Sequence, residues 1–166
     1  PASATSGTVS LGDTDLTTLG DGDLTRLRRD RVGFIFQAFN LVPTLDAREN
    51  ITLPTSLAGR KPDQGWLDQV IDTVGLRDRL KHRPSELSGG QQQRVAVARA
   101  LASRPEIVFA DEPTGNLDSA TGAQVIELLF RMNREHGTTL VLVTHDEALA
   151  DRCDRRISIS AGVVQA

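Results

Sequence analysis

The chain lacks several features that mark particular classes of protein. It has a single cysteine, Cys153, in 166 residues, which excludes an internal disulfide and a multi-cysteine zinc site. Its longest aliphatic run, Leu140 to Val143, is far shorter than the roughly 20 residues of a membrane-spanning helix. Basic residues are not in excess, because 19 Lys and Arg stand against 22 Asp and Glu, a net charge of −3. This balance disfavours a nucleic acid partner.

The remaining composition is that of a globular α/β protein. Short, continuous apolar runs predict buried strands at Val32–Gln37, Ile107–Ala110 and Thr139–Thr144. Helical patterns occupy Gln91–Ser103 and Ser119–Glu135. Unpatterned strands that alternate with helices favour a parallel sheet covered on both faces.

Four other segments differ in composition and hydrophobic pattern from these alternating strands and helices. Residues 38–87 contain four prolines between stretches of helical spacing, of which Trp66–Val74 is the clearest, and we interpret them as a small helical insertion. Apolar alternation broken by a glycine predicts a hairpin near Gly12 and a second one turning at Ala161-Gly162. The segment Asp21–Arg31 is polar and Arg-rich.

Each predicted core strand ends in a polar side chain. The first ends at Gln37, the second at Asp111-Glu112 and the third at His145. Ligands of open α/β sheets gather at the carboxyl ends of the strands, so these groups could form a metal-assisted hydrolytic site. Asp111 suits Mg²⁺, and Glu112 suits the general base for an attacking water. Each residue alone could equally be a loop residue that hydrogen-bonds to the backbone.

The run Leu87-Ser-Gly-Gly-Gln-Gln-Gln-Arg94 predicts a helix N-terminus that could bind an anion. Ser88 and Gln91 have the spacing of a capping box, and Gly89 and Gly90 would leave the first turn open to a ligand. Free N–H groups at such an end favour phosphate. A plain capped helix would explain the serine and the glutamine, but not the paired glycines.

These residues together resemble the ATP-binding subunits of ATP-binding-cassette (ABC) transporters. Leu87–Gln91 is similar to the family's signature, Ile107–Glu112 to its Walker B strand and Gln37 to its Q-loop. Gly115–Asp118 resembles the D-loop and His145 the switch histidine. The motifs follow the family's order over most of the chain, and they look most like the branch of lipoprotein release, macrolide export and cell division.

The resemblance implies a P-loop NTPase-like fold, with a mainly parallel sheet flanked by helices and antiparallel β elements at both ends of the chain. Residues 1–37 and 88–166 would form the nucleotide-binding core, with 38–87 as the helical insertion. It also implies ATP and Mg²⁺ as cofactors, a homodimer or another ATPase–ATPase dimer, and an integral membrane permease as partner. The subunit would lie in the cytoplasm against the inner face of the membrane, coupling hydrolysis to export.

The resemblance also assigns roles to single residues. Ser88, Gly89, Gly90 and Gln91 of one subunit would cap the γ-phosphate held by the other, and Asp118 would link the two sites. Gln37 would contact Mg²⁺ or the attacking water, and Asp111 would bind Mg²⁺. Glu112 would be the base, and His145 would hold the γ-phosphate.

One family motif has no counterpart in this sequence. A Gly-x-x-x-x-Gly-Lys-Ser/Thr loop is absent, and neither Lys61 nor Lys81 has its spacing. We expect this Walker A loop, with its strand and helix, to lie upstream of Pro1, so that the chain is truncated and inactive as an ATPase. A deliberate fragment or a natural loss of activity would account for the same absence.

Two other functions are possible from the sequence. A non-catalytic module could dock on a permease or on an intact ATPase. A relative that acts on DNA breaks or chromosomes is disfavoured, because residues 38–87 are too few for its coiled coil and show no heptads.

Overall fold

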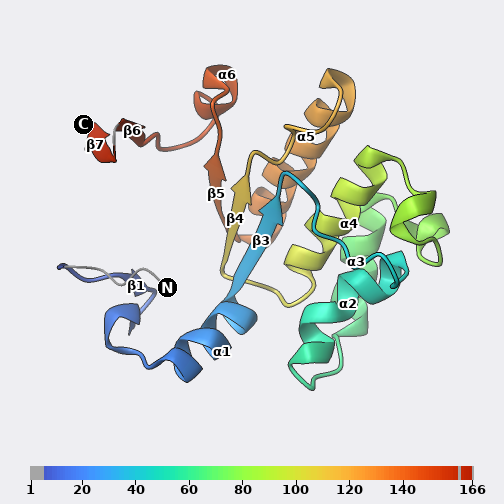
Figure 1. Ribbon diagram of the computed structural model, residues 1–166, viewed down its shortest axis with the longest axis horizontal. Helices are drawn as coiled ribbons and strands as arrows, with labels where there is room; N and C mark the ends of the chain where they lie inside the picture. The colour runs from blue at the N-terminus through green and yellow to red at the C-terminus, as the bar shows by residue number, and fades with distance from the viewer. Residues whose placement is uncertain (1–5, 161, 166) are drawn as a thin grey trace.

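The computed structural model describes residues 6–160 and 162–165, and a parallel sheet of three strands lies at its centre (Figure 1). The strands are β3 (Val32–Phe36), β4 (Ile107–Asp111) and β5 (Thr139–Val143), in the order β3-β4-β5. Asp111 pairs with Phe36 on one side and with Val143 on the other. The three strands therefore end level, and the expected α/β fold with a parallel sheet is confirmed.

Helices, 3₁₀ turns and two hairpins make up the other regular elements of the described chain. The helices are α1 (Asp21–Arg31), α2 (Ala47–Leu57), α3 (Gln64–Val74), α4 (Gly89–Leu101), α5 (Ser119–His136) and α6 (Glu147–Ala150), with 3₁₀ turns at Leu16–Thr18, Arg77–Arg79 and Pro84–Glu86. The predicted first hairpin forms from β1 (Ser10–Leu11) and β2 (Thr14–Asp15), with Gly12 at φ +55°. The second forms from β6 (Ser158–Ser160) and β7 (Val163–Gln165), although Ala161 of its turn lies outside the described residues. In the part of the chain that the structure describes, no helix combines the length and the apolar character needed to cross a bilayer.

Helix α1 was not predicted from the sequence, because it buries none of its residues. Its ends explain why it is helical. Asp21 and Asp23 lie in its first turn, and Arg28, Arg29 and Arg31 lie in its last. Acidic residues near a helix N-terminus and basic residues near the C-terminus each stabilise it through the helix dipole.

Helices α4 and α5 cover one face of the sheet. Ile35 of β3 and Ala110 of β4 are fully buried on that face. At Gly33, a Cβ would lie 2.6 Å from the carbonyl oxygen of Ala100 in α4. Glycine at this position therefore allows α4 to pack directly on the β3 backbone.

The expectation of a sheet covered on both faces is wrong for the described residues. Phe34, Phe36, Phe109 and Val143 are 36% to 53% exposed on the other face. The phenylalanine rings stack on one another: the ring centroid of Phe34 lies 5.9 Å from that of Phe36 and 5.7 Å from that of Phe109. A continuous apolar run cannot distinguish a strand buried on both sides from one whose outward rings only cover each other.

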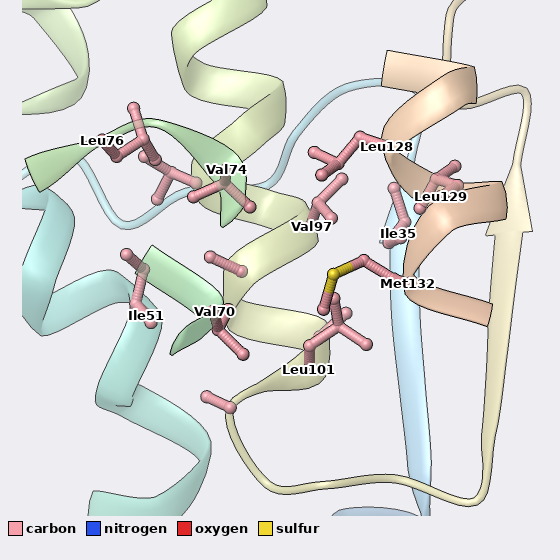
Figure 2. Packing of buried hydrophobic residues seen from close by; sticks show 14 of the residues in the cluster. Ile35, Ile51, Val70, Val74, Leu76, Val97, Leu101, Leu128, Leu129 and Met132 are labelled. Atoms are coloured by element: carbon pink, nitrogen blue, oxygen red, sulfur yellow. The ribbon is translucent and has the colours of Figure 1, made fainter. Parts of the chain in front are cut away.

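The helices between Ala38 and Leu87 share one core with the sheet layer. Val70 and Val74 of α3 pack toward α4, and Val97 and Leu101 of α4 face Met132 of α5 (Figure 2). Buried Asn50 of α2 fixes the preceding loop by accepting from the Val42 N–H and donating to three carbonyl groups, those of Val42, Leu45 and Asp46. The chain that leaves Gln37 is thereby anchored to α2.

Candidate functional site

The predicted site residues at the three strand ends come together. Gln37 and Glu112 each follow the last residue of adjacent strands, and His145 lies two residues beyond β5. The level ends of parallel strands explain this convergence, as expected from the sequence. Asp111 is exposed at the end of the middle strand.

Glu112 and His145 are in direct contact. One carboxylate oxygen of Glu112, Oε1, accepts from the backbone N–H of His145 at 2.9 Å and lies 2.7 Å from its Nδ1. Because a carboxylate only accepts, the proton of this bond is on Nδ1. The side chain of Glu112 is 24% exposed and that of His145 is 88% exposed. The carboxylate is thus held in one direction at the edge of solvent.

The backbone at Glu112 is strained. Its φ is +44°, a region that few residues other than glycine adopt. Two hydrogen bonds hold this turn, from the Glu112 N–H to the Val143 carbonyl at 2.9 Å and from the Gly115 N–H to the Glu112 carbonyl at 3.0 Å. Residues held this way cluster at functional sites.

The loop of residues 113–118, which contains the predicted D-loop, packs against Gln37. Asn116 donates from Nδ2 to the Gln37 carbonyl oxygen at 2.8 Å. A Cβ at Gly115 would overlap the Gln37 amide, with Cδ at only 2.9 Å. Asn116 was not predicted from the sequence as a contact of Gln37, because the two residues are 79 positions apart and no spacing rule joins them.

Arg99 holds the other side of the turn at Gln37, and nothing in the sequence indicated this contact either. Its guanidinium donates to the carbonyl oxygens of Asn40 at 2.6 Å and Phe39 at 2.8 Å. Both of those residues have positive φ, at +49° and +57°. Burial lowers the pKa of Arg99 from its ordinary value, and the two carbonyl groups compensate part of that cost.

The predicted capping box at the start of α4 is confirmed. Ser88 Oγ accepts from the Gln91 N–H at 3.3 Å, and Gln91 Oε1 accepts from the Ser88 N–H at 2.9 Å. The side chain of Ser88 is exposed. This helix end is therefore formed by the residues that the sequence indicated.

The structure gives a different reason for the second glycine. A Cβ at Gly90 would overlap Cγ2 of Thr121, in the first turn of α5. A Cβ at Gly89 would only reach ordinary contact, 3.6 Å from Leu117. Gly90 is thus required by the packing of α4 against α5, whereas the sequence pattern alone indicated ligand access.

Asp118 caps the N-terminus of α5. Its Oδ1 accepts from the N–H groups of Ala120 at 3.1 Å and Thr121 at 3.0 Å. The Thr121 side-chain hydrogen bond, followed by the Thr121 backbone N–H, lowers the pKa of Asp118 from its ordinary value. These hydrogen bonds therefore favour the ionised form of Asp118 in the folded chain.

The described residues offer part of a ligand shell for a metal ion. Among the residues that the structure describes, no group of three or more His, Cys, Asp or Glu side chains could hold one. Asp111 and Gln37 are exposed on adjacent strand ends and offer the hard oxygen atoms that Mg²⁺ prefers. Such an ion usually takes one or two protein ligands and completes its shell with water and phosphate oxygens.

The fold is that of an ATP-binding cassette. The structure superposes with a TM-score of 0.83 on a solved protein described as "Dimeric structure of a post-hydrolysis state of the ATP-binding cassette MJ0796 bound to ADP and Pi". The two sequences are 42% identical, and the match covers 98% of this chain and 72% of that one.

Sequence comparisons give the family. A family model described as "ABC transporter" matches residues 2–115. The "Uncharacterized ABC transporter ATP-binding protein YbbA" of Escherichia coli K12 is 49% identical over 162 residues, which are 96% of this chain and 71% of that protein. The "Lipoprotein-releasing system ATP-binding protein LolD" of Novosphingobium aromaticivorans is 47% identical over 162 residues, 96% of this chain and 72% of that protein. The chain belongs to the ABC transporter family.

Proposed function

We propose that this chain is part of the ATP-binding subunit of an export-type ABC transporter, in which a closed dimer hydrolyses ATP and drives a membrane permease. The observation that carries the proposal is the convergence of Gln37, Glu112 and His145 at the level ends of β3, β4 and β5. The relatives named above are transporter ATP-binding proteins, and the cassette MJ0796 is described as dimeric and bound to ADP and phosphate.

The donor groups at the sheet edge fit Mg²⁺ and ATP. Asp111 would bind the metal, and Gln37 would contact the metal or the attacking water. When bound, the nucleotide would supply the phosphoanhydride bond that is broken, and the metal would neutralise the negative charge of the phosphate oxygens. The chain's own contribution is to position these groups and to stabilise the developing charge.

Glu112 would take a proton from the attacking water. Its Oε1 is engaged by His145, which leaves the second carboxylate oxygen for this task. His145 would hold a γ-phosphate oxygen from Nε2. Because Nδ1 already donates to Glu112, His145 can donate from Nε2 only when both ring nitrogens carry a proton.

The start of α4 would complete the site of a second copy. Ser88, Gly89, Gly90 and Gln91 would present N–H and hydroxyl donors to the γ-phosphate bound by the other subunit, and Asp118 would link the two sites. Residues 1–37 and 88–166 would form the nucleotide-binding core. Residues 38–87 would form the helical insertion that faces an integral membrane permease, with the subunit in the cytoplasm against the membrane.

The test is Mg²⁺-dependent phosphate release. The sequence has no Gly-x-x-x-x-Gly-Lys-Ser/Thr motif, so we expect the chain to bind nucleotide weakly and to hydrolyse little. The assay therefore also uses a fusion in which a Gly-x-x-x-x-Gly-Lys-Ser/Thr loop, with its strand and helix, precedes the chain. In that fusion we expect ATPase activity, lowered about 10²-fold or more by Glu112→Gln, because a general base contributes at least that much.

The matched control is Glu135→Gln, the same change at an exposed position near the end of α5. It should leave the rate unchanged. Equal rates for the Glu112 and Glu135 variants would refute the catalytic role. Binding to a permease without nucleotide, in a fusion that lacks activity, would favour the non-catalytic docking module instead.

A further inference from the structure

Gln93 is a fully buried glutamine that the proposed chemistry does not use. It lies in the second turn of α4 and is 0% exposed. Its Nε2 donates to the carbonyl oxygen of Pro113 at 2.6 Å. Its Oε1 is buried without a hydrogen-bond partner in the described residues.

This arrangement is costly if Gln93 only fills space. Burying an amide removes its hydration, and the unpaired oxygen regains nothing in return. An apolar side chain of the same length would fill the volume without that cost. What the amide supplies, and an apolar side chain does not, is the donor to Pro113.

The Pro113 carbonyl occupies a sensitive place in the chain. It directly follows Glu112, whose φ is +44°, and it begins the loop of residues 113–118 that contacts Gln37 through Asn116. A proline also favours extended backbone for the residue before it. The turn at Glu112 therefore needs an external constraint, and the Gln93 hydrogen bond is one that comes from outside the loop and from outside the sheet.

We propose that Gln93 is a positioning residue that fixes the Glu112 turn, and with it the Glu112–His145 contact, by holding the Pro113 carbonyl from helix α4. The same helix carries Ser88 and Gly89 at its N-terminus. Gln93 would thus set the distance between the helix end and the strand-end carboxylate within one subunit. The importance of that geometry for hydrolysis rests on the proposed function, whereas the contact itself does not.

The test variant is Gln93→Met, an unbranched side chain of similar length that cannot donate. It leaves the Pro113 carbonyl unpaired but also removes the unpaired Oε1, so the two effects on folding oppose each other. The urea midpoint should then stay near that of the parent. The matched control is Gln92→Met, which removes a comparable bond, from Gln92 Nε2 to the Leu87 carbonyl at 3.1 Å, on the same helix.

The first measurement is the ¹⁵N spectrum of the histidine side chains in the chain itself, which has three histidines. In the parent, His145 should show the Nδ1–H form that donates to Glu112. Gln93→Met should move the His145 signals toward those of a freely exchanging imidazole and leave His82 unchanged. Gln92→Met should not move them. An unchanged His145 spectrum in folded Gln93→Met would overturn the proposal.

The second measurement is hydrolysis by the fusion described above. Gln93→Met should lower kcat roughly tenfold to a hundredfold, because a small misplacement of a reacting group has effects of this size, with KM for ATP little changed. An inactive fusion with a shifted His145 spectrum would refute the proposed function and leave the positioning role standing. A normal kcat and an unshifted His145 spectrum in Gln93→Met would refute the positioning role of Gln93 and leave the proposed function standing.

A second variant covers the case in which Gln93→Met does not fold. In Gln93→Glu, burial favours the neutral carboxylic acid, which can donate to Pro113. At each pH the His145 spectrum of Gln93→Glu is compared with that of the parent at the same pH, and the two should agree at low pH and diverge as the introduced carboxyl group ionises. A difference from the parent that does not change with pH, over the range in which the variant stays folded, would count against the proposal.

Discussion

Replacing Gly90 with alanine tests whether packing or ligand access requires that glycine. The new Cβ would meet Cγ2 of Thr121 on α5, with Thr121 Cβ at 3.7 Å. Thr121 is β-branched and helical, so its side chain has few rotamers with which to move away. The backbone of Gly90 is not among the residues with positive φ, and alanine is therefore strained only by this contact.

Two opposing terms set the expected magnitude. Overpacking of this kind costs about 1–3 kcal/mol, whereas alanine is favoured over glycine within a helix by about 1 kcal/mol. Gly90→Ala should then lower the free energy of unfolding by roughly 1 kcal/mol. Thr121→Ser removes Cγ2 but keeps the hydroxyl group and the backbone N–H that donates to Asp118. In that background, Gly90→Ala should be neutral or stabilise by up to about 1 kcal/mol.

The assay is a double-mutant cycle in which circular dichroism monitors unfolding by urea. The comparison requires that the four chains have the same m-value, the slope of the free energy of unfolding against urea concentration. The four chains are the parent, Gly90→Ala, Thr121→Ser and the double variant. A coupling energy of about 1–2 kcal/mol is expected, because the double variant should be more stable than the summed effects of the two single substitutions on the free energy of unfolding predict. If Gly90→Ala has the same effect in both backgrounds, the packing explanation is wrong.

Two further predictions concern pH and the core. Hydrogen bonds from Thr121 hold the pKa of Asp118 below its ordinary value, so its ionised form contributes stability that is present above the unfolded pKa and is lost as pH falls through the folded pKa. Asn is also a good helix cap, but Asp118→Asn removes the carboxyl group, so the urea midpoint of the variant should fall less steeply than the parent's below about pH 4. A fall as steep as the parent's would refute the role of Asp118 in the pH dependence. Trp66→Phe removes the bond from Nε1 to the Leu101 carbonyl at 2.8 Å, which should destabilise the chain by about 1–3 kcal/mol. Circular dichroism rather than fluorescence must follow it, because Trp66 is the chain's single tryptophan, and a change below about 0.5 kcal/mol would contradict the bond's importance.

The sequence predicted the elements whose signal is apolar periodicity. The strands at Val32, Ile107 and Thr139 and the helix α5 appear within a few residues of their expected bounds. Helix α1 was missed because its signal lies in the order of its charges. The second face of the sheet was misjudged because the stacked rings of Phe34 and Phe109 give the same apolar pattern as a buried face.

The site divides in the same way between local and long-range signals. Ser88, Gln91 and the strand-end residues follow from spacing along the chain. Asn116 and Arg99 act through backbone carbonyls that are distant in sequence, and their partners could not be read from it. Gln93 is an intermediate case, since it lies three and four residues before Ala96 and Val97 on the buried face of α4. Helical spacing alone could have predicted its burial, although not its bond to Pro113.

The strain at Glu112 shows why these long-range contacts matter to the site. A residue other than glycine in the left-handed region costs about 1–2 kcal/mol, and the proline that follows favours a different conformation. The turn persists because several neighbours hold it, namely Val143 on β5, Gly115 in the loop and Gln93 on α4. Each comes from a different element, so a shift of any one changes the direction of the carboxylate. The position of Glu112 is therefore a property of the packed helices and strands together, and residues remote from the strand ends should alter the site without touching it.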